Sequence, residues 1–116
     1  MANSKPNIIF ITFDSGRADR MGFLGCRKNI TPFLDSVAKE GIYFRHAFAT
    51  GPGSSVSFSG IFTSTYPLDY GGYSYITRPR VMLSEALKDG GYTTVGMHSS
   101  PYLSSYFGYD RGWDEF

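Results

Sequence analysis

A carboxylate and a hydroxyl occupy positions where a folded chain can place reactive groups. Asp14 directly follows an apolar run, residues 7–13, and Ser54 directly follows the stretch "ATGPG". An Asp oxygen can bind a hard divalent cation, and a serine at a helix N-terminus could attack an ester or be activated by a metal. That helix end also offers N–H groups and a positive dipole to a phosphate or sulfate. The pair therefore suits the chemistry of anionic esters.

Each of these residues also has a purely structural interpretation. An Asp-Ser-Gly sequence after a strand commonly forms a turn in which the acid accepts hydrogen bonds from nearby backbone N–H groups. Ser54 and Ser55, before a helix, are commonly N-caps. Arg17 lies near Asp14 and could hold an anionic ester with two parallel hydrogen bonds, or it could be a solvated loop residue. These alternatives stay open at the level of sequence.

Three strands and three helices are expected to position these groups. The run 7–13 is continuously β-branched and aromatic, which is typical of a strand buried on both faces of a parallel sheet. Further strands are predicted at 42–48 and 92–97. The order of strands and helices favours an α/β architecture with a mostly parallel sheet. In such sheets functional groups collect beyond the carboxyl ends of the strands, where Asp14 stands.

The helices are marked by turn and capping residues. Thr31-Pro32, an apolar stripe and Gly41 predict a helix over 32–40. Helical spacing predicts a short helix from Ser54 to Thr63, and another around Leu83 and Leu87 that is closed by Gly90-Gly91. Residues 65–80 are rich in Tyr, Gly and Pro, which indicates a structured surface loop. This loop could shape a substrate pocket or could be a packing flap.

The composition limits the class of protein. The chain has 116 residues, a formal net charge of +1, 41% hydrophobic and 18% charged residues. One core is therefore expected, in one domain over 1–116, and no basic block indicates a nucleic-acid or membrane partner. Cys26 is the single cysteine, and the N-terminus has no signal-peptide pattern. We expect a soluble protein of the cytoplasm.

Four stretches in register resemble a known family. They are "KPNIIFITFDSGRADRMGFLG", "NITPFLDSVAKEGIYFRHAFAT", "SFSGIFTSTYP" and "LKDGGYTTVGMHSSPYLSSYFGYDRGWDEF". Together they resemble the N-terminal part of the sulfatases, within the alkaline phosphatase superfamily. The resemblance implies a three-layer α/β/α sandwich that cleaves sulfate or phosphate esters with a divalent metal bound at the strand ends.

The resemblance also implies roles for individual residues. Asp14 matches the first metal-binding aspartate, and Ser54 falls where the family places its nucleophile and could itself contact the metal. In true sulfatases this nucleophile is a Cys or Ser converted to formylglycine, whereas phosphate-cleaving relatives use an unmodified Ser or Thr. Arg17 is assigned as an anion clamp. The implied cofactor is calcium first, with manganese, magnesium or zinc as alternatives, and the partner is a small anionic ester.

The chain departs from the family pattern in several places. Sulfatases usually show Pro or Ala two residues after the nucleophile and Arg two residues later, but residues 54–58 place Phe58 at the arginine position. Phe13 stands where many members have a second metal-binding Asp, and Ser99 and Pro101 replace a Lys and a His. We therefore expect an atypical branch.

The resemblance covers only the start of the family's much longer catalytic domain. A cation bound by Asp14 and Ser54 alone would have too few protein oxygens for a tight site. The chain is expected to be a fragment, weakly active or inactive alone, as a sulfate-ester hydrolase. The alternatives are a phosphate-ester hydrolase or phosphotransferase, and a non-catalytic module that binds an anion or a partner. Open sheet surface would favour self-association.

Overall fold

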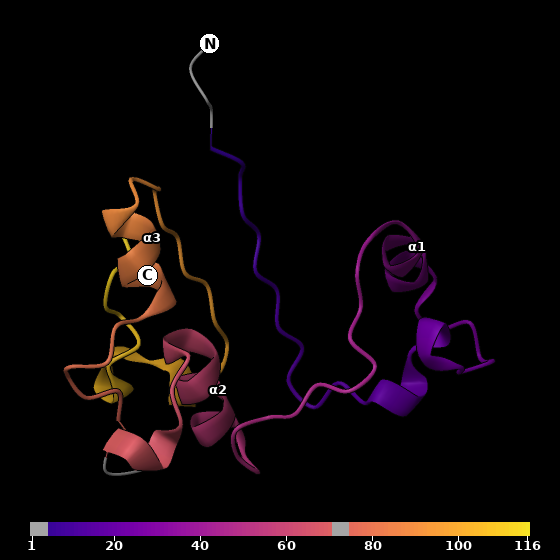
Figure 1. The fold of residues 1–116 in the computed structure, drawn as a ribbon, viewed down its shortest axis with the longest axis horizontal. Coiled ribbons are helices and arrows are strands. Elements are labelled where there is room, and N and C mark those ends of the chain that lie inside the picture. Colours follow the sequence, from indigo (N-terminus) through magenta and orange to yellow (C-terminus); the bar gives the residue numbers. More distant parts are fainter. Residues whose placement is uncertain (1–4, 71–74) are drawn as a thin grey trace. The chain divides into compact units, whose positions relative to one another are not determined.

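A computed structural model describes residues 5–70 and 75–116 of the chain (Figure 1). The chain divides into two compact units, Met1–Ala47 and Phe48–Phe116, and each is described by itself. Asp14 and Arg17 belong to the first unit, and Ser54 belongs to the second.

The first unit is built around helix α1, Pro32–Glu40, which follows the 3-10 turns η1 (Ala18–Arg20) and η2 (Gly22–Leu24). The helix predicted at 32–40 is confirmed with its proline at the first helical position. Thr31 occupies the N-cap position without capping through its side chain. Its hydroxyl instead accepts a hydrogen bond from Gly22 N at 2.9 Å and donates to Asp35 Oδ1. The helix start is thus used to attach η2.

The second unit places helix α2, Ser54–Thr63, against a small core. The other elements are η3 (Pro67–Tyr70), α3 (Leu83–Asp89), η4 (Pro101–Leu103) and η5 (Ser105–Phe107). The buried core cluster consists of Phe58, Ile76, Met82 and Tyr109, with Phe62, Leu103 and Phe107 packed against it. Both further predicted helices are confirmed, because α2 has its expected bounds and α3 ends directly before Gly90.

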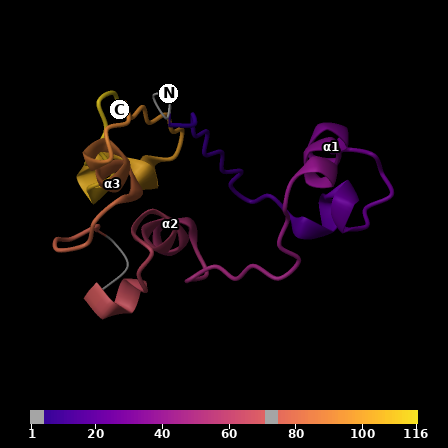
Figure 2. The same cartoon turned by 45° about the horizontal axis from the view of Figure 1, so that its top comes forward.

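The C-terminal segment lies beside α3 (Figure 2). Polar contacts attach it there, among them a hydrogen bond from Ser84 Oγ to Arg111 O at 2.6 Å. Arg111 Nη2 lies 2.6 Å from Glu85 Oε2 and also donates to the carbonyl oxygen of Arg80. The carboxylate of Asp114 accepts from Thr94 N at 2.8 Å and pairs with Lys88 Nζ at 2.7 Å. The hydrogen bond from Lys88 and those from Thr94 lower the pKa of Asp114 to about 2.

The three predicted strands do not form in the described part of the chain. Residues 7–13 run without helical turns or ladder partners (Figure 1), and Ile9 is 84% exposed. Residues 42–48 likewise pair with no strand, and 92–97 contribute only a parallel bridge between Val95 and Glu115. A strand exists only where a neighbour completes its hydrogen bonds, which an apolar run cannot supply by itself. The α/β/α sandwich therefore stays a prediction.

Two other sequence expectations concern the surface. The tyrosine-rich loop contains η3 and ends with buried Ile76 and Arg80, so its described parts are structured, while 71–74 lie outside the described residues. No helix within 5–70 and 75–116 is both long and apolar enough to cross a membrane.

Candidate functional site

Asp14 lies at the beginning of a tight turn in the first unit. The turn is closed by a hydrogen bond from Gly16 N to Phe13 O at 3.4 Å, and Ser15 adopts a left-handed conformation with φ of 58°. This turn is the one that the Asp-Ser-Gly sequence predicts. The turn follows the apolar run immediately, and Asp14 is an exposed residue within it.

Arg17 is held by an acidic neighbour. Its Nε and Nη2 atoms donate to the two carboxylate oxygens of Asp19, each at 2.8 Å, and both side chains are exposed. This pair raises the pKa of Arg17 and lowers that of Asp19. The Nε and Nη2 donors, which could bind an anion with two parallel hydrogen bonds, are thereby occupied by Asp19. An anionic ester would have to displace Asp19 before Arg17 could act as its clamp.

Ser54 is the first residue of α2, and Gly53 occupies the N-cap position with an extended backbone. The interpretation of Ser54 and Ser55 as N-caps is therefore wrong by one or two positions. Ser57 N donates to Gly53 O at 2.9 Å, which begins the helical hydrogen-bond pattern. Glycine can take the N-cap role that was assigned to the serines, so Ser54 enters the first turn of the helix.

Close backbone packing fixes the approach to Ser54. Ser57 Oγ donates to Gly51 O at 3.2 Å. A Cβ atom at Gly51 would overlap the side chain of Val56, and one at Gly60 would overlap that of Thr50. Both glycines are therefore required by contact with neighbouring side chains. The absence of a side chain at both positions allows the loop before α2 to pack closely against the helix.

The N-terminus of α2 suits an anion electrostatically. Its first turn contains no acidic residue, so no carboxylate of that turn offsets the positive end of the helix dipole. The backbone carbonyl of Ser55 accepts from the Tyr109 hydroxyl at 3.5 Å. Burial raises the pKa of Tyr109 to about 12, against a smaller opposing effect of Arg80. Tyr109 therefore remains a neutral hydrogen-bond donor beside this helix.

Arg80 is a buried cation that the sequence did not single out. The residue is 2% exposed, its Nε donates to Thr65 Oγ1 at 3.0 Å, and its guanidinium lies over the Tyr70 ring. Its Nη2 atom has no hydrogen-bond partner among the described residues. The Thr65 hydroxyl in turn contacts Thr63 Oγ1, in the last turn of α2. Arg80 thus supports the end of α2 opposite Ser54.

The residues present do not form a complete metal site. Among residues 5–70 and 75–116, no group of three or more His, Cys, Asp and Glu side chains could hold an ion. Calcium takes six or more oxygen ligands, of which one carboxylate supplies at most two, and zinc usually takes four ligands. Asp14 therefore fits a metal only as one ligand of a larger set.

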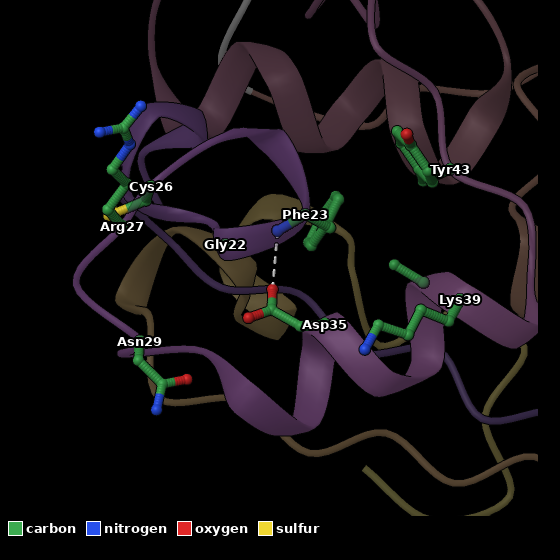
Figure 3. Close-up of a pocket in the computed structure, with 9 residues that line it drawn as sticks. Gly22, Phe23, Cys26, Arg27, Asn29, Asp35, Lys39 and Tyr43 are labelled. Atoms are coloured by element: carbon green, nitrogen blue, oxygen red, sulfur yellow. Dashed lines mark hydrogen bonds between the residues drawn. The ribbon is translucent and has the colours of Figure 1, made fainter.

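The first unit contains a pocket of about 480 Å³ (Figure 3). Phe23 and Tyr43 form an edge-to-face pair at its wall, with ring centroids 5.3 Å apart. The Asp35 carboxylate accepts from Phe23 N at 2.8 Å, so this acid is used to hold η2 on α1 (Figure 3). Neither Asp14 nor Arg17 lines the pocket. The expected convergence of Asp14 with Ser54 joins different units and stays a prediction.

Comparison with known proteins places these residues in context. The family model described as Sulfatase matches residues 6–116. An ulvan-active sulfatase of Formosa agariphila is 33% identical over 118 residues, covering 97% of this chain and 23% of its own length. An N-acetylgalactosamine-6-O-sulfatase of Bacteroides thetaiotaomicron is 32% identical over 100 residues, covering 79% of this chain and 20% of its own. The chain spans about a fifth of the length of these curated relatives. No solved structure matches it significantly.

Proposed function

Because this chain belongs to the sulfatase family, we propose that it supplies the N-terminal part of a metal-dependent hydrolase that cleaves sulfate esters of sugars. The sugar class is suggested by the relatives named as acting on ulvan and on N-acetylgalactosamine 6-O-sulfate. The observation that carries the proposal is the position of Ser54, where the family places its nucleophile, in the first turn of a helix without acidic residues.

In the proposed mechanism Ser54 provides the attacking oxygen and α2 provides the anion site. The N–H groups at the start of a helix and its dipole stabilise the negative oxygens of a sulfate or phosphate group. A divalent ion, when bound through Asp14 and further ligands, would neutralise ester charge and favour ionisation of a hydroxyl. Ser54 acts either as an unmodified hydroxyl or after conversion to formylglycine. Arg17 would assist by exchanging Asp19 for the anionic ester.

A phosphate ester is the second candidate substrate, favoured by Phe58. The position at which sulfatases usually carry an arginine is here part of the buried core, where Phe58 is only 7% exposed. Phenylalanine has no charge, so this position cannot supply a cation to the nucleophile. This difference speaks against the usual sulfatase arrangement, in which an arginine lies beside the nucleophile. A non-catalytic anion-binding module is the third reading of the same departure.

The test compares p-nitrophenyl sulfate and p-nitrophenyl phosphate in the presence of calcium, manganese, magnesium or zinc. It uses this chain and the longest form that the same gene encodes. We expect Ser54→Ala to abolish turnover with only a modest loss of metal affinity, whereas Asp14→Ala should lose the metal. Ser55→Ala is the matched control, because it removes a hydroxyl from the next position of the same helix.

Three outcomes would contradict these assignments. Wild-type turnover in Ser54→Ala would remove that residue from the mechanism, and wild-type calcium affinity in Asp14→Ala, measured by titration calorimetry, would remove Asp14 from the metal site. Activity on neither ester in either form would favour the non-catalytic module. Location in the cytoplasm also stays a prediction, which fractionation of cells that express the protein would test.

A further inference from the structure

Four aromatic side chains of the second unit form an exposed cluster, here called the aromatic platform: Tyr75, Tyr102, Tyr106 and Phe107. Phe107 lies in the middle, with ring centroids 4.9 Å from Tyr106, 5.4 Å from Tyr75 and 6.1 Å from Tyr102. The three tyrosines surround it and remain 47%, 51% and 70% exposed at positions 75, 102 and 106. Large aromatic surface is therefore presented to solvent around a semi-buried centre.

The platform is held in place from below. Phe107 packs against the core cluster, and its carbonyl oxygen accepts from Ile76 N at 2.9 Å, which ties the segments of Tyr75 and Tyr106 together. The Tyr75 hydroxyl donates to the Tyr106 hydroxyl at 2.8 Å. Two exposed rings thereby keep a fixed mutual orientation. A ligand that settles on them would not have to order them first, which favours affinity.

We propose that the aromatic platform binds a sugar ring of the carbohydrate that carries the ester. The inference rests on the proposed function, which it deepens by naming a carbohydrate subsite outside the reacting group. One face of a hexose ring exposes C–H bonds that pack on an aromatic face, while its rim of hydroxyls needs polar partners. Tyrosine offers both, a rigid ring and a hydroxyl, with few rotatable bonds to immobilise.

The size of the platform favours a sugar over a protein partner. A stable protein interface buries about 800 Å² on each side. A large aromatic side chain carries about 150–250 Å², and each of the four is already partly covered, so the exposed area of the platform is smaller than such an interface. A single sugar ring needs only one or two aromatic faces. The platform also belongs to the unit that carries Ser54, because η4, which contains Tyr102, packs against α2. A sugar bound there would be held by the same unit as the proposed nucleophile.

The test measures binding of a sulfated galactan oligosaccharide and of its chemically desulfated form by titration calorimetry. We expect Tyr106→Ala and Tyr75→Ala each to weaken binding of both forms by up to roughly tenfold, since aromatic contacts are worth about 0.5–1.5 kcal/mol. Tyr106→Phe should lose less, because it keeps the ring. Tyr66→Ala is the matched control, an equally exposed tyrosine at 68% outside the platform. Turnover of p-nitrophenyl sulfate, which has no sugar, should stay unchanged in all four variants.

The readouts separate this proposal from the proposed function. Platform-dependent binding without turnover of any ester would uphold the sugar subsite and contradict the hydrolase. Turnover with platform variants that bind both oligosaccharides like wild type would contradict the subsite alone, as would a wild type that binds neither form. If the variants instead abolish self-association in sedimentation velocity experiments, the platform contacts a second copy of the chain and the sugar subsite is wrong.

Discussion

Replacement of Arg111 tests whether the second unit is held together by the contact between its C-terminal segment and α3. Arg111 donates to both carboxylate oxygens of Glu85, at 2.6 and 3.1 Å, and to the carbonyl oxygen of Arg80 at 2.6 Å. The side chains of Arg111 and Glu85 are 17% and 22% exposed. Arg111→Met keeps the aliphatic length and removes these donors, which leaves the Glu85 carboxylate partly buried without its ion pair.

The expected magnitude follows from this partial burial. Breaking a fully buried pair costs about 3–5 kcal/mol, whereas an exposed pair contributes about 0–1 kcal/mol. With about a fifth of each side chain exposed, we expect a loss of about 2 kcal/mol in the free energy of unfolding. Since urea acts with a slope of about 1–3 kcal/mol per M in small proteins, the unfolding midpoint should fall by about 1 M.

Urea unfolding followed by tryptophan fluorescence measures this change. Trp113 is the single tryptophan, and its Nε1 donates to Tyr109 O at 2.8 Å, so the signal reports on the second unit. Arg111→Lys should recover only part of the loss, because it keeps the charge without the planar fork. Arg78→Met is the control, an exposed arginine of the same unit that acts on Glu85 only weakly and through its charge, so its loss should cost less than about 0.5 kcal/mol. A midpoint for Arg111→Met equal to that of Arg78→Met would refute the reasoning.

Three further outcomes are expected. The pKa of Asp114 is lowered from 3.8 to about 2, so the contribution of this carboxylate to stability is present above about pH 4 and should be lost as the pH falls to about 2. Guanidinium unfolding at several pH values measures this loss. Asp114→Asn should remove that part of the pH dependence. Met82→Ala, at a core residue 1% exposed, should cost about 2–5 kcal/mol in urea, and a loss no larger than for Leu83→Ala, at 37% exposed, would contradict the packing argument. The exposed apolar runs 7–13 and 42–48 should cause self-association, and a sedimentation coefficient independent of concentration would exclude it.

The helices could be predicted because their signals are local. Thr31-Pro32 and Gly41 mark both ends of α1 within the helix and its direct neighbours, and the end of α3 is fixed by Gly90. Even there, one detail was not local: the Thr31 hydroxyl binds Gly22 instead of capping its own helix. Helix propensity depends on neighbouring residues, so it cannot predict that the Gly22 N–H of another turn binds this hydroxyl.

The strands and the contacts between segments could not be predicted in the same way. A strand at 7–13 depends on a neighbour that its own residues do not specify, and the ion pair of Arg111 with Glu85 joins positions far apart in the sequence. For the candidate site, the sequence predicted the bounds of α2 with Ser54 as its first residue and also the Asp14 turn, but it gave the serines the N-cap position that Gly53 occupies. The Asp19 partner of Arg17 and the burial of Arg80 depend on side-chain directions, which spacing does not encode.

The packing of residues 50–60 onto themselves has a consequence for how the proposed nucleophile is aimed. The Thr50 side chain packs against Gly60, and the Val56 side chain packs against Gly51, so the loop and the helix are in close contact on both sides. The position of Ser54 then depends on this local packing. Gly60→Ala would displace the Thr50 side chain and so shift the segment that carries Ser54, although residue 60 does not contact Ser54 itself. Residues elsewhere that contact the substrate could therefore be substituted during evolution without changing the position of Ser54.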